Sequence, residues 1–240
     1  MQLASGTRVD EIADAIYRIN TAIDIPGGPG RFNFNQYLIA DDRPLLFHTG
    51  PRRLFPHVSE GVAAVMPVTK LRFVAFSHFE ADECGALNAW LAAAPQSQPV
   101  CGRIAKMVSV DDVADRPARA LADAETLDLG RHVVRWFDTP HVPHGWDCGL
   151  MMEERTRTFL CGDLFTQGGG GEVALTESDI LEPSEAFRAP LDYFSHAPES
   201  AAVLARLADM RPATLACMHG SAYRGDGEGL LRALAARLER

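Results

Sequence analysis

Several features that define other protein classes are scarce in this sequence of 240 residues. No apolar run approaches the ~20 residues of a membrane-spanning helix. Residues 1–12 lack the basic patch and apolar stretch of a signal peptide. The five cysteines are odd in number and form no Cys-x-x-Cys pair, which argues against a disulfide framework and a structural zinc ribbon. We therefore expect a protein of the reducing cytoplasm.

Basic residues are also few, with 23 Lys and Arg against 32 Asp and Glu and a net charge of -9. Nucleic acids and anionic membranes repel such a chain on average, so no nucleic-acid or membrane partner is expected. The one glycine run, residues 168–171, is not followed by the Lys-Ser/Thr pair of a phosphate-binding loop. The composition, 47% hydrophobic and 23% charged, is typical of a globular protein, and we expect a single domain over residues 1–240.

Short apolar segments alternate with amphipathic ones along the chain. The pattern predicts strands at residues 34–40, 45–48, 72–77, 132–137, 148–152 and 158–161. It predicts helices at residues 84–93, 201–210 and 229–238. Strands dominate the first part and helices return between the later ones, which indicates an α/β fold with many hairpins.

Polar residues at the ends of these strands form the strongest chemical signal. His78, Glu80 and Asp82 occupy alternate positions directly after one strand. An acidic loop that caps a helix would explain Asp82 and Glu83, but it would not explain the histidine. Further candidate ligands follow other strands: His141, His144, Asp163 and His219. Because nitrogen and oxygen donors gathered at strand ends suit a metal ion, the sequence predicts a metal site.

The order of these segments resembles the metallo-β-lactamase superfamily, which implies a four-layer αβ/βα sandwich. Residues 34–39 and 48–50 resemble the opening hairpin of that superfamily, in which an Asp usually stands at the position of His48. Most members carry His-x-His-x-Asp-His, whereas here Glu80 replaces the second His and Glu83 the last. The remaining His-x-Glu-x-Asp pattern resembles the diiron domain of flavodiiron proteins, of the oxygen-binding diiron protein type.

The resemblance implies two metal ions and assigns a role to each candidate ligand. His78, Glu80 and one histidine of the 139–147 loop would hold the first metal. Asp82 and His219 would hold the second, and Asp163 would bridge the two. Glu83 would either bind the second metal directly or leave water there.

The loop histidine has two candidates. In the diiron branch the ligand is followed three positions on by Asp, which selects His144 together with Asp147. The Thr-Pro-Gly-His pattern of the wider superfamily points instead to His141, which follows Thr139-Pro140. We favour His144, and the other histidine would then contact the ligands or line the pocket.

The charge of the ligand set bears on the metal. Glu80, Asp82 and Asp163 bring negative charge, and Glu83 could add more. Carboxylates are hard donors that stabilise oxidised iron or manganese, whereas a histidine-rich site suits zinc. We therefore expect two iron ions, with zinc or manganese as alternatives.

Two classes of function stay open. The first is a diiron protein that binds or reduces O2 or NO. Flavodiiron proteins carry a flavodoxin domain after the diiron domain, and no residues remain for one here. No flavin is therefore expected on this chain, and turnover would need a separate flavodoxin- or rubredoxin-like electron donor. The alternative is a metallo-hydrolase that uses a hydroxide between the metals on an ester, thioester or phosphoester.

The sequence gives less on the pocket and the assembly. Phe79, Trp146, Phe165 and residues 168–171 are candidates for pocket walls, and apolar walls would suit a small gas. Assembly as a homodimer stays open.

Overall fold

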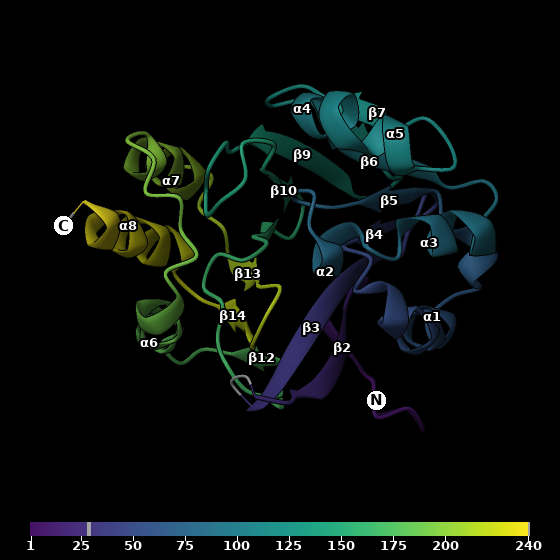
Figure 1. Ribbon diagram of the computed structural model, residues 1–240, viewed down its shortest axis with the longest axis horizontal. Helices are drawn as coiled ribbons and strands as arrows, with labels where there is room; N and C mark the ends of the chain where they lie inside the picture. Colours follow the sequence, from purple (N-terminus) through teal and green to yellow (C-terminus); the bar gives the residue numbers. More distant parts are fainter. Residues whose placement is uncertain (28–29, 240) are drawn as a thin grey trace.

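Two sheets lie face to face between two layers of helices (Figure 1). The structure is a computed structural model that describes residues 1–27 and 30–239. Each sheet has seven strands. The first sheet and its helices come from the first half of the chain, and the second sheet and its helices come from the rest (Figure 1).

The first sheet changes from antiparallel to parallel pairing at its fourth strand. Its strands are, in spatial order, β1 (Arg8–Ala13), β2 (Ile16–Ile25), β3 (Gly30–Ile39), β4 (Leu45–Phe47), β5 (Phe73–Ala75), β6 (Gln98–Gly102) and β7 (Arg119–Leu121). The helices of this half are α1 (Phe55–Ala63), α2 (Ala81–Cys84), α3 (Leu87–Ala93), α4 (Arg103–Ala105) and α5 (Asp111–Val113). Short turns of 3-10 helix at Arg52–Leu54 and Val68–Lys70 and a π-helical turn at Lys106–Val110 connect them.

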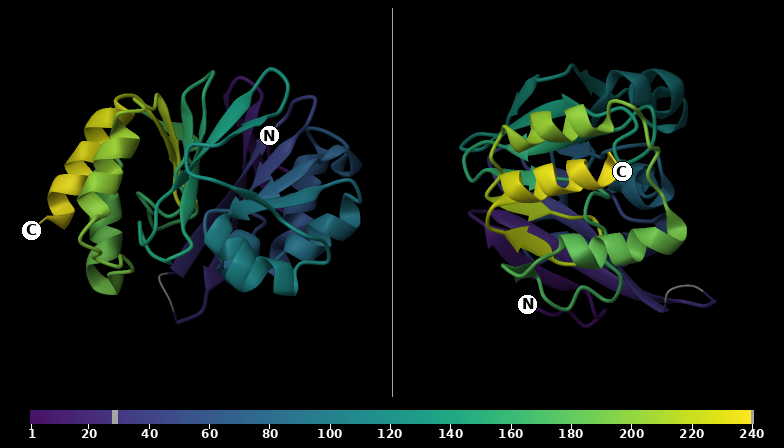
Figure 2. Two further views of the ribbon diagram at one scale, coloured as in Figure 1. Left: turned by 90° about the horizontal axis from the view of Figure 1, so that it is seen from above. Right: turned by 90° about the vertical axis from the view of Figure 1, so that its left-hand side faces the viewer.

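The second sheet is mixed. Its strands are, in spatial order, β12 (Leu175–Thr176), β14 (Ala222–Arg224), β13 (Thr214–Ala216), β11 (Thr158–Leu160), β10 (Gly149–Glu153), β9 (Val133–Asp138) and β8 (Thr126–Asp128). Helices α6 (Leu181–Leu191), α7 (Ser200–Ala208) and α8 (Gly227–Leu238) cover its outer face (Figure 2). Among the described residues, no helix has the length and apolar character needed to cross a membrane.

Three apolar clusters hold these layers together. The middle cluster joins the two sheets and contains Phe47 of β4 and Trp136 of β9. The two outer clusters join each sheet to its helices, and they contain Trp90 of α3 and Leu231 of α8 respectively. Burial of apolar side chains on both faces of each sheet makes this a four-layer αβ/βα sandwich, which confirms the predicted fold.

The prediction of one continuous helix over residues 84–93 is wrong. The structure has α2 and α3 instead, with Gly85 at the break. A Cβ at this glycine would lie 2.2 Å from the carbonyl oxygen of Ala81, so no larger residue fits this turn. The sequence pattern also missed α1 and α6. Their apolar faces are interrupted by proline or by polar residues.

The glycine run at residues 168–171 has defined contacts to the first sheet. Gly169 forms an isolated bridge with Phe32. The carbonyl oxygen of Gly171 accepts a 2.9 Å hydrogen bond from Nη2 of Arg18, a fully buried residue of β2. The loop is therefore attached to β2 and β3, although glycine alone gives it little intrinsic order.

Candidate metal centre

The predicted ligands meet where strands of both sheets end. His78 and Glu80 follow β5, and His144 lies in the loop between β9 and β10. Asp163 and His219 follow β11 and β13, which pair in parallel with Leu160 opposite Ala216. Each of these two candidate ligands is the third residue after its paired position, so the register of the sheet carries them to the same edge. The sheet topology therefore collects side chains that are far apart in the sequence.

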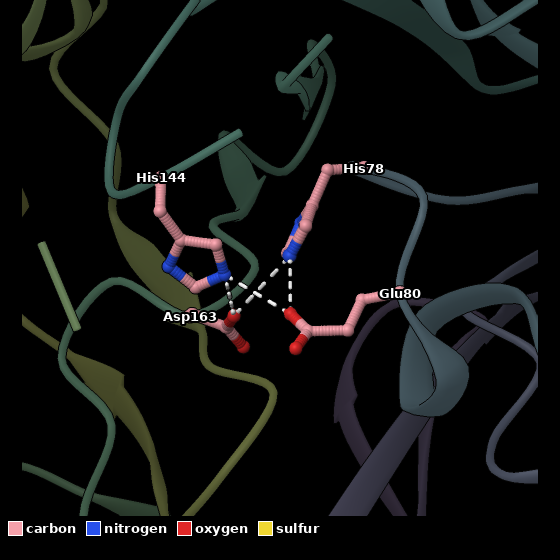
Figure 3. Close-up of side chains that lie close together, drawn as sticks. All are labelled: His78, Glu80, His144 and Asp163. Carbon is pink, nitrogen blue, oxygen red and sulfur yellow. Dashed lines mark hydrogen bonds and ion pairs between the residues drawn. The ribbon is translucent and has the colours of Figure 1, made fainter. Parts of the chain in front are cut away.

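Four of these side chains form a first group (Figure 3). Oε2 of Glu80 lies 3.0 Å from Nε2 of His78 and 3.1 Å from Nε2 of His144. Oδ2 of Asp163 lies 3.7 Å and 3.5 Å from the same two nitrogen atoms. Each residue thus points one potential ligand atom at a common centre, as a metal ion requires.

A second group consists of Asp82, Glu83 and His219. Nε2 of His219 lies 3.4 Å from Oδ2 of Asp82 and 3.5 Å from Oδ1 of Asp163. Asp163 therefore turns one carboxylate oxygen toward each group. This is the geometry expected of a carboxylate shared by two metal ions.

Buried oxygen atoms without hydrogen-bond partners indicate that the groups fit metal ions. Both carboxylate oxygens of Glu83 are fully buried, and neither has a partner among the described residues. The same holds for Oδ1 of Asp163. Since unpaired buried carboxylate oxygens are costly in a folded protein, a cation is the natural partner for them. The donors, imidazole nitrogen and carboxylate oxygen, suit iron, manganese and zinc.

The carboxylates of the centre differ in how they hold protons in the metal-free protein. Hydrogen bonds with His144 and His78 lower the pKa of Glu80 to about 2. Burial opposes ionisation of Asp82, but its interaction with His219 lowers its pKa below the ordinary value. Burial, together with the charges of Asp163 and Asp82, raises the pKa of Glu83 well above its ordinary value.

The histidines compensate this negative charge. Burial alone would lower the pKa of His219, but Asp163 and Asp82 raise it to about 10. The pKa of His78 is raised too, because interactions with Cys148 and Glu80 outweigh the effect of its burial. Without metal ions, protonated imidazoles therefore supply the positive charge that the carboxylates need.

Backbone contacts fix the orientation of His219. Its Nδ1 lies 2.7 Å from the carbonyl oxygen of Asn33 on β3, which can only accept a hydrogen bond. Because Nδ1 donates a hydrogen bond to this oxygen, the ring is oriented with Nε2 toward Asp82 and Asp163. Neighbouring polar contacts hold this turn, because Nδ2 of Asn35 donates to the carbonyl oxygens of Cys217 and Gly220.

The two loop histidines have different environments. His144 belongs to the first group, as preferred from the sequence. His141 is exposed, has a φ of 66°, and belongs to neither group. Oδ2 of Asp147 accepts a 2.9 Å hydrogen bond from the backbone nitrogen of Phe79, which ties this loop to the His78 segment.

A small cavity of about 180 Å³ opens over both groups. Its apolar wall consists of Phe32, Phe187, Leu191 and Tyr193. Phe32 stacks on the His219 ring with 4.4 Å between centroids. Most of this wall comes from α6 and the residues after it, where the sequence pattern gave no signal.

The pocket walls proposed from the sequence lie mostly elsewhere. Trp146 is 57% exposed and lines a separate hollow, while Phe165 is buried in the core. Phe79 lines a larger hollow of about 740 Å³, which Glu80 and residues of α3 also line.

Comparisons with known proteins point in one direction. A family model described as "ODP family beta lactamase" matches residues 32–220. The rubredoxin-oxygen oxidoreductase of Megalodesulfovibrio gigas is 25% identical over 203 residues, covering 80% of this chain and 49% of that protein. The anaerobic nitric oxide reductase flavorubredoxin of Vibrio vulnificus is 23% identical over 206 residues, covering 80% of this chain and 40% of that protein. The chain thus spans half or less of the length of these curated relatives.

Among solved structures, a diflavin flavoprotein A 5 fragment (residues 1–254) from Nostoc superposes with a TM-score of 0.83 at 20% identity. The match covers 97% of this chain and 95% of that one. It supports the same four-layer fold.

Proposed function

The chain belongs to the ODP family of β-lactamase-like proteins, and we propose that it is a diiron protein that binds or reduces O2 or NO. In this proposal the whole chain, residues 1–240, forms one metallo-β-lactamase-like domain. Its relatives include a rubredoxin-oxygen oxidoreductase and an anaerobic nitric oxide reductase flavorubredoxin.

The observation that carries the proposal is the place of Glu80. Its Oε2 lies within 3.1 Å of Nε2 of both His78 and His144, so a hard anionic donor completes the first group. The second group contributes Asp82 and Glu83, and Asp163 faces both groups. Such a carboxylate-rich set favours iron over zinc, because it compensates the higher charge of oxidised iron.

In this assignment each residue has a defined part. The first metal is held by His78, Glu80 and His144, and the second by Asp82, Glu83 and His219, with Asp163 shared between them. Two iron ions in these positions would supply the electrons that O2 or NO accepts. The side chains of the protein would hold the ions and shape the cavity.

The cavity favours a small ligand. Its volume of about 180 Å³ is below the ~300–1,000 Å³ of pockets for drug-sized molecules. Phe32, Phe187 and Leu191 make its wall largely apolar. Burial raises the pKa of Tyr193, so its hydroxyl keeps its proton. This hydroxyl donates a hydrogen bond to the carbonyl oxygen of Asp163. The cavity therefore suits a diatomic gas better than an extended ester or thioester.

Turnover requires a separate electron donor in this proposal. Complete reduction of O2 to water takes more electrons than two ferrous ions hold. We propose a flavodoxin- or rubredoxin-like protein as that donor, and the name of the rubredoxin-oxygen oxidoreductase supports this choice.

The test compares iron-loaded and zinc-loaded protein. Reduced anaerobically, the iron-loaded protein should take up O2 or NO once, and it should turn over only when reduced rubredoxin is supplied. Asp163→Asn should lose this uptake, whereas Asp24→Asn, at an exposed position of β2, should retain it. Rapid hydrolysis of esters, thioesters or phosphodiesters by the zinc-loaded protein, with the iron-loaded protein inert to both gases, would make the chain a hydrolase.

A further inference from the structure

A chain of hydrogen bonds lies beneath His78, on the side away from the metal groups. Nδ1 of His78 lies 2.9 Å from Oγ of Ser77, and the same oxygen lies 3.0 Å from Nε2 of His48. Nδ1 of His48 in turn lies 3.0 Å from Sδ of Met218. His48, Ser77 and His78 are each at most 3% exposed, so water does not compete for these contacts.

The sulfur atom of Met218, at the far end of this hydrogen-bonded series, determines which atom donates in each hydrogen bond. The thioether of Met218 has no hydrogen to donate, so the proton between it and His48 belongs on Nδ1 of His48. In a neutral imidazole the other nitrogen, Nε2, is then an acceptor. The hydroxyl of Ser77 must therefore donate to Nε2 of His48.

The same reasoning reaches His78. Once the single hydroxyl hydrogen of Ser77 is used toward His48, its oxygen accepts a hydrogen bond from Nδ1–H of His78. The proton on Nδ1 leaves Nε2 of His78 able to present a lone pair. This nitrogen is the one that faces Glu80 and Asp163.

Two further observations concern His48, and the first agrees with a neutral ring. Burial lowers its pKa to about 3 in spite of the nearby Asp163. Its backbone has a φ of 66°, in the left-handed region that non-glycine residues seldom adopt. The turn after β4 places the ring between Ser77 and Met218 at the expense of an unfavourable backbone conformation.

We propose that His48 and Ser77 are positioning residues that hold His78 in its Nδ1–H tautomer and so aim the Nε2 lone pair at the first metal. The inference rests on the proposed function only in taking His78 as a metal ligand. The inference adds a series of hydrogen bonds that extends from His78 to Met218, the neighbour of His219. This series connects candidate ligands of both metals through the protein interior.

The direct test is the tautomer of each ring in zinc-loaded protein, which is diamagnetic. Long-range ¹H–¹⁵N correlation spectra should show His48 neutral with its proton on Nδ1, and His78 with its proton on Nδ1 and zinc on Nε2. A His48 protonated on Nε2, or on both nitrogens, would overturn the proposal.

Variants test the consequence for metal binding with Co²⁺ as the probe. Ser77→Ala should weaken binding of one of the two Co²⁺ ions about 10–100-fold, as contacts behind a ligand typically do, and leave the other largely unchanged. His48→Leu should act alike, while His48→Gln, which keeps an acceptor near the Nε2 position, should restore most of the affinity.

The control is His132→Gln, at a fully buried histidine that contacts Glu153 and belongs to neither metal group. It should lower stability without changing the stepwise Co²⁺ affinities. Equal affinities in the wild type and Ser77→Ala, or an equal loss in His132→Gln, would refute the positioning role. Because Co²⁺ binding is independent of O2 or NO uptake, failure of the gas reaction alone would count against the proposed function and not against this inference.

Discussion

Loading the centre with metal should release protons, and the number follows from the charges in the metal-free protein. His78 and His219 have raised pKa values, about 10 for His219, so both rings carry an extra proton near neutral pH. Burial and the charges of Asp163 and Asp82 raise the pKa of Glu83 well above its ordinary value, which favours the protonated form of this carboxyl. Metal ligands must give up such protons, so the two rings predict the release of about two protons per loaded centre, and the raised pKa of Glu83 adds to this number.

The sign of the pH dependence follows from the same count. Each released proton makes metal binding stronger by about tenfold per pH unit while the group is still protonated. Overall affinity should therefore rise steeply with pH through neutrality and less steeply above the pKa of His219, about 10, because His78 still releases a proton there. Glu80, with a pKa of about 2, is already ionised in this range and contributes nothing to the slope.

Calorimetric titration with Zn²⁺ in buffers of different ionisation enthalpy measures the release directly. Glu83→Gln replaces the buried carboxyl by an amide that cannot titrate and should lower the number of protons released. Glu60→Gln, on α1 and outside both metal groups, should leave it unchanged. Release of less than one proton by the wild type, or an unchanged count in Glu83→Gln, would refute this account of the charges.

Three other outcomes are expected. His144→Ala should reduce metal affinity in a competition assay more than His141→Ala, for which a loss of at most about 10–100-fold is expected, and the reverse ranking would move the ligand role to His141. Glu80→His removes a negative charge beside the ions, so it should raise the reduction potential of the iron-loaded centre and shift the metal preference toward zinc; a lowered potential in electrochemical titration would contradict this. Trp90→Ala empties a fully buried site and breaks a hydrogen bond to Thr49, so urea unfolding should show a loss of about 3–5 kcal/mol, and a loss below about 1 kcal/mol would contradict the packing described.

The order of the motifs predicted the fold through a resemblance to a known superfamily, and the same motifs supplied candidate ligands that the structure brings together. His78 and Asp82 follow a short apolar strand, and this pattern is local, so it can be read without a structure. The choice between His141 and His144 was only a preference, because both lie in one loop. Their different exposure depends on how that loop packs against the segment around Phe79.

Other features depend on contacts that no local pattern contains. His48 and Met218 are 170 positions apart, and Arg18 reaches Gly220 over 202 positions. The cavity wall depends on α6, whose two prolines hide its helical period. Asn33 and Asn35 are buried because they contact the turn around His219, which is far away in the sequence.

The three apolar clusters have a consequence for the life of the protein in a cell. All three are built from side chains outside the two metal groups, and the middle one joins the sheets directly. Small metal-dependent domains unfold when a chelator removes their ion, because the metal replaces a core that they lack. Here the apolar core is complete without a metal ion. In the absence of metal, the positive charge of the protonated imidazoles compensates the negative charge of the carboxylates. We expect the chain to stay folded when its metal ions are removed and to bind metal again on resupply without new synthesis.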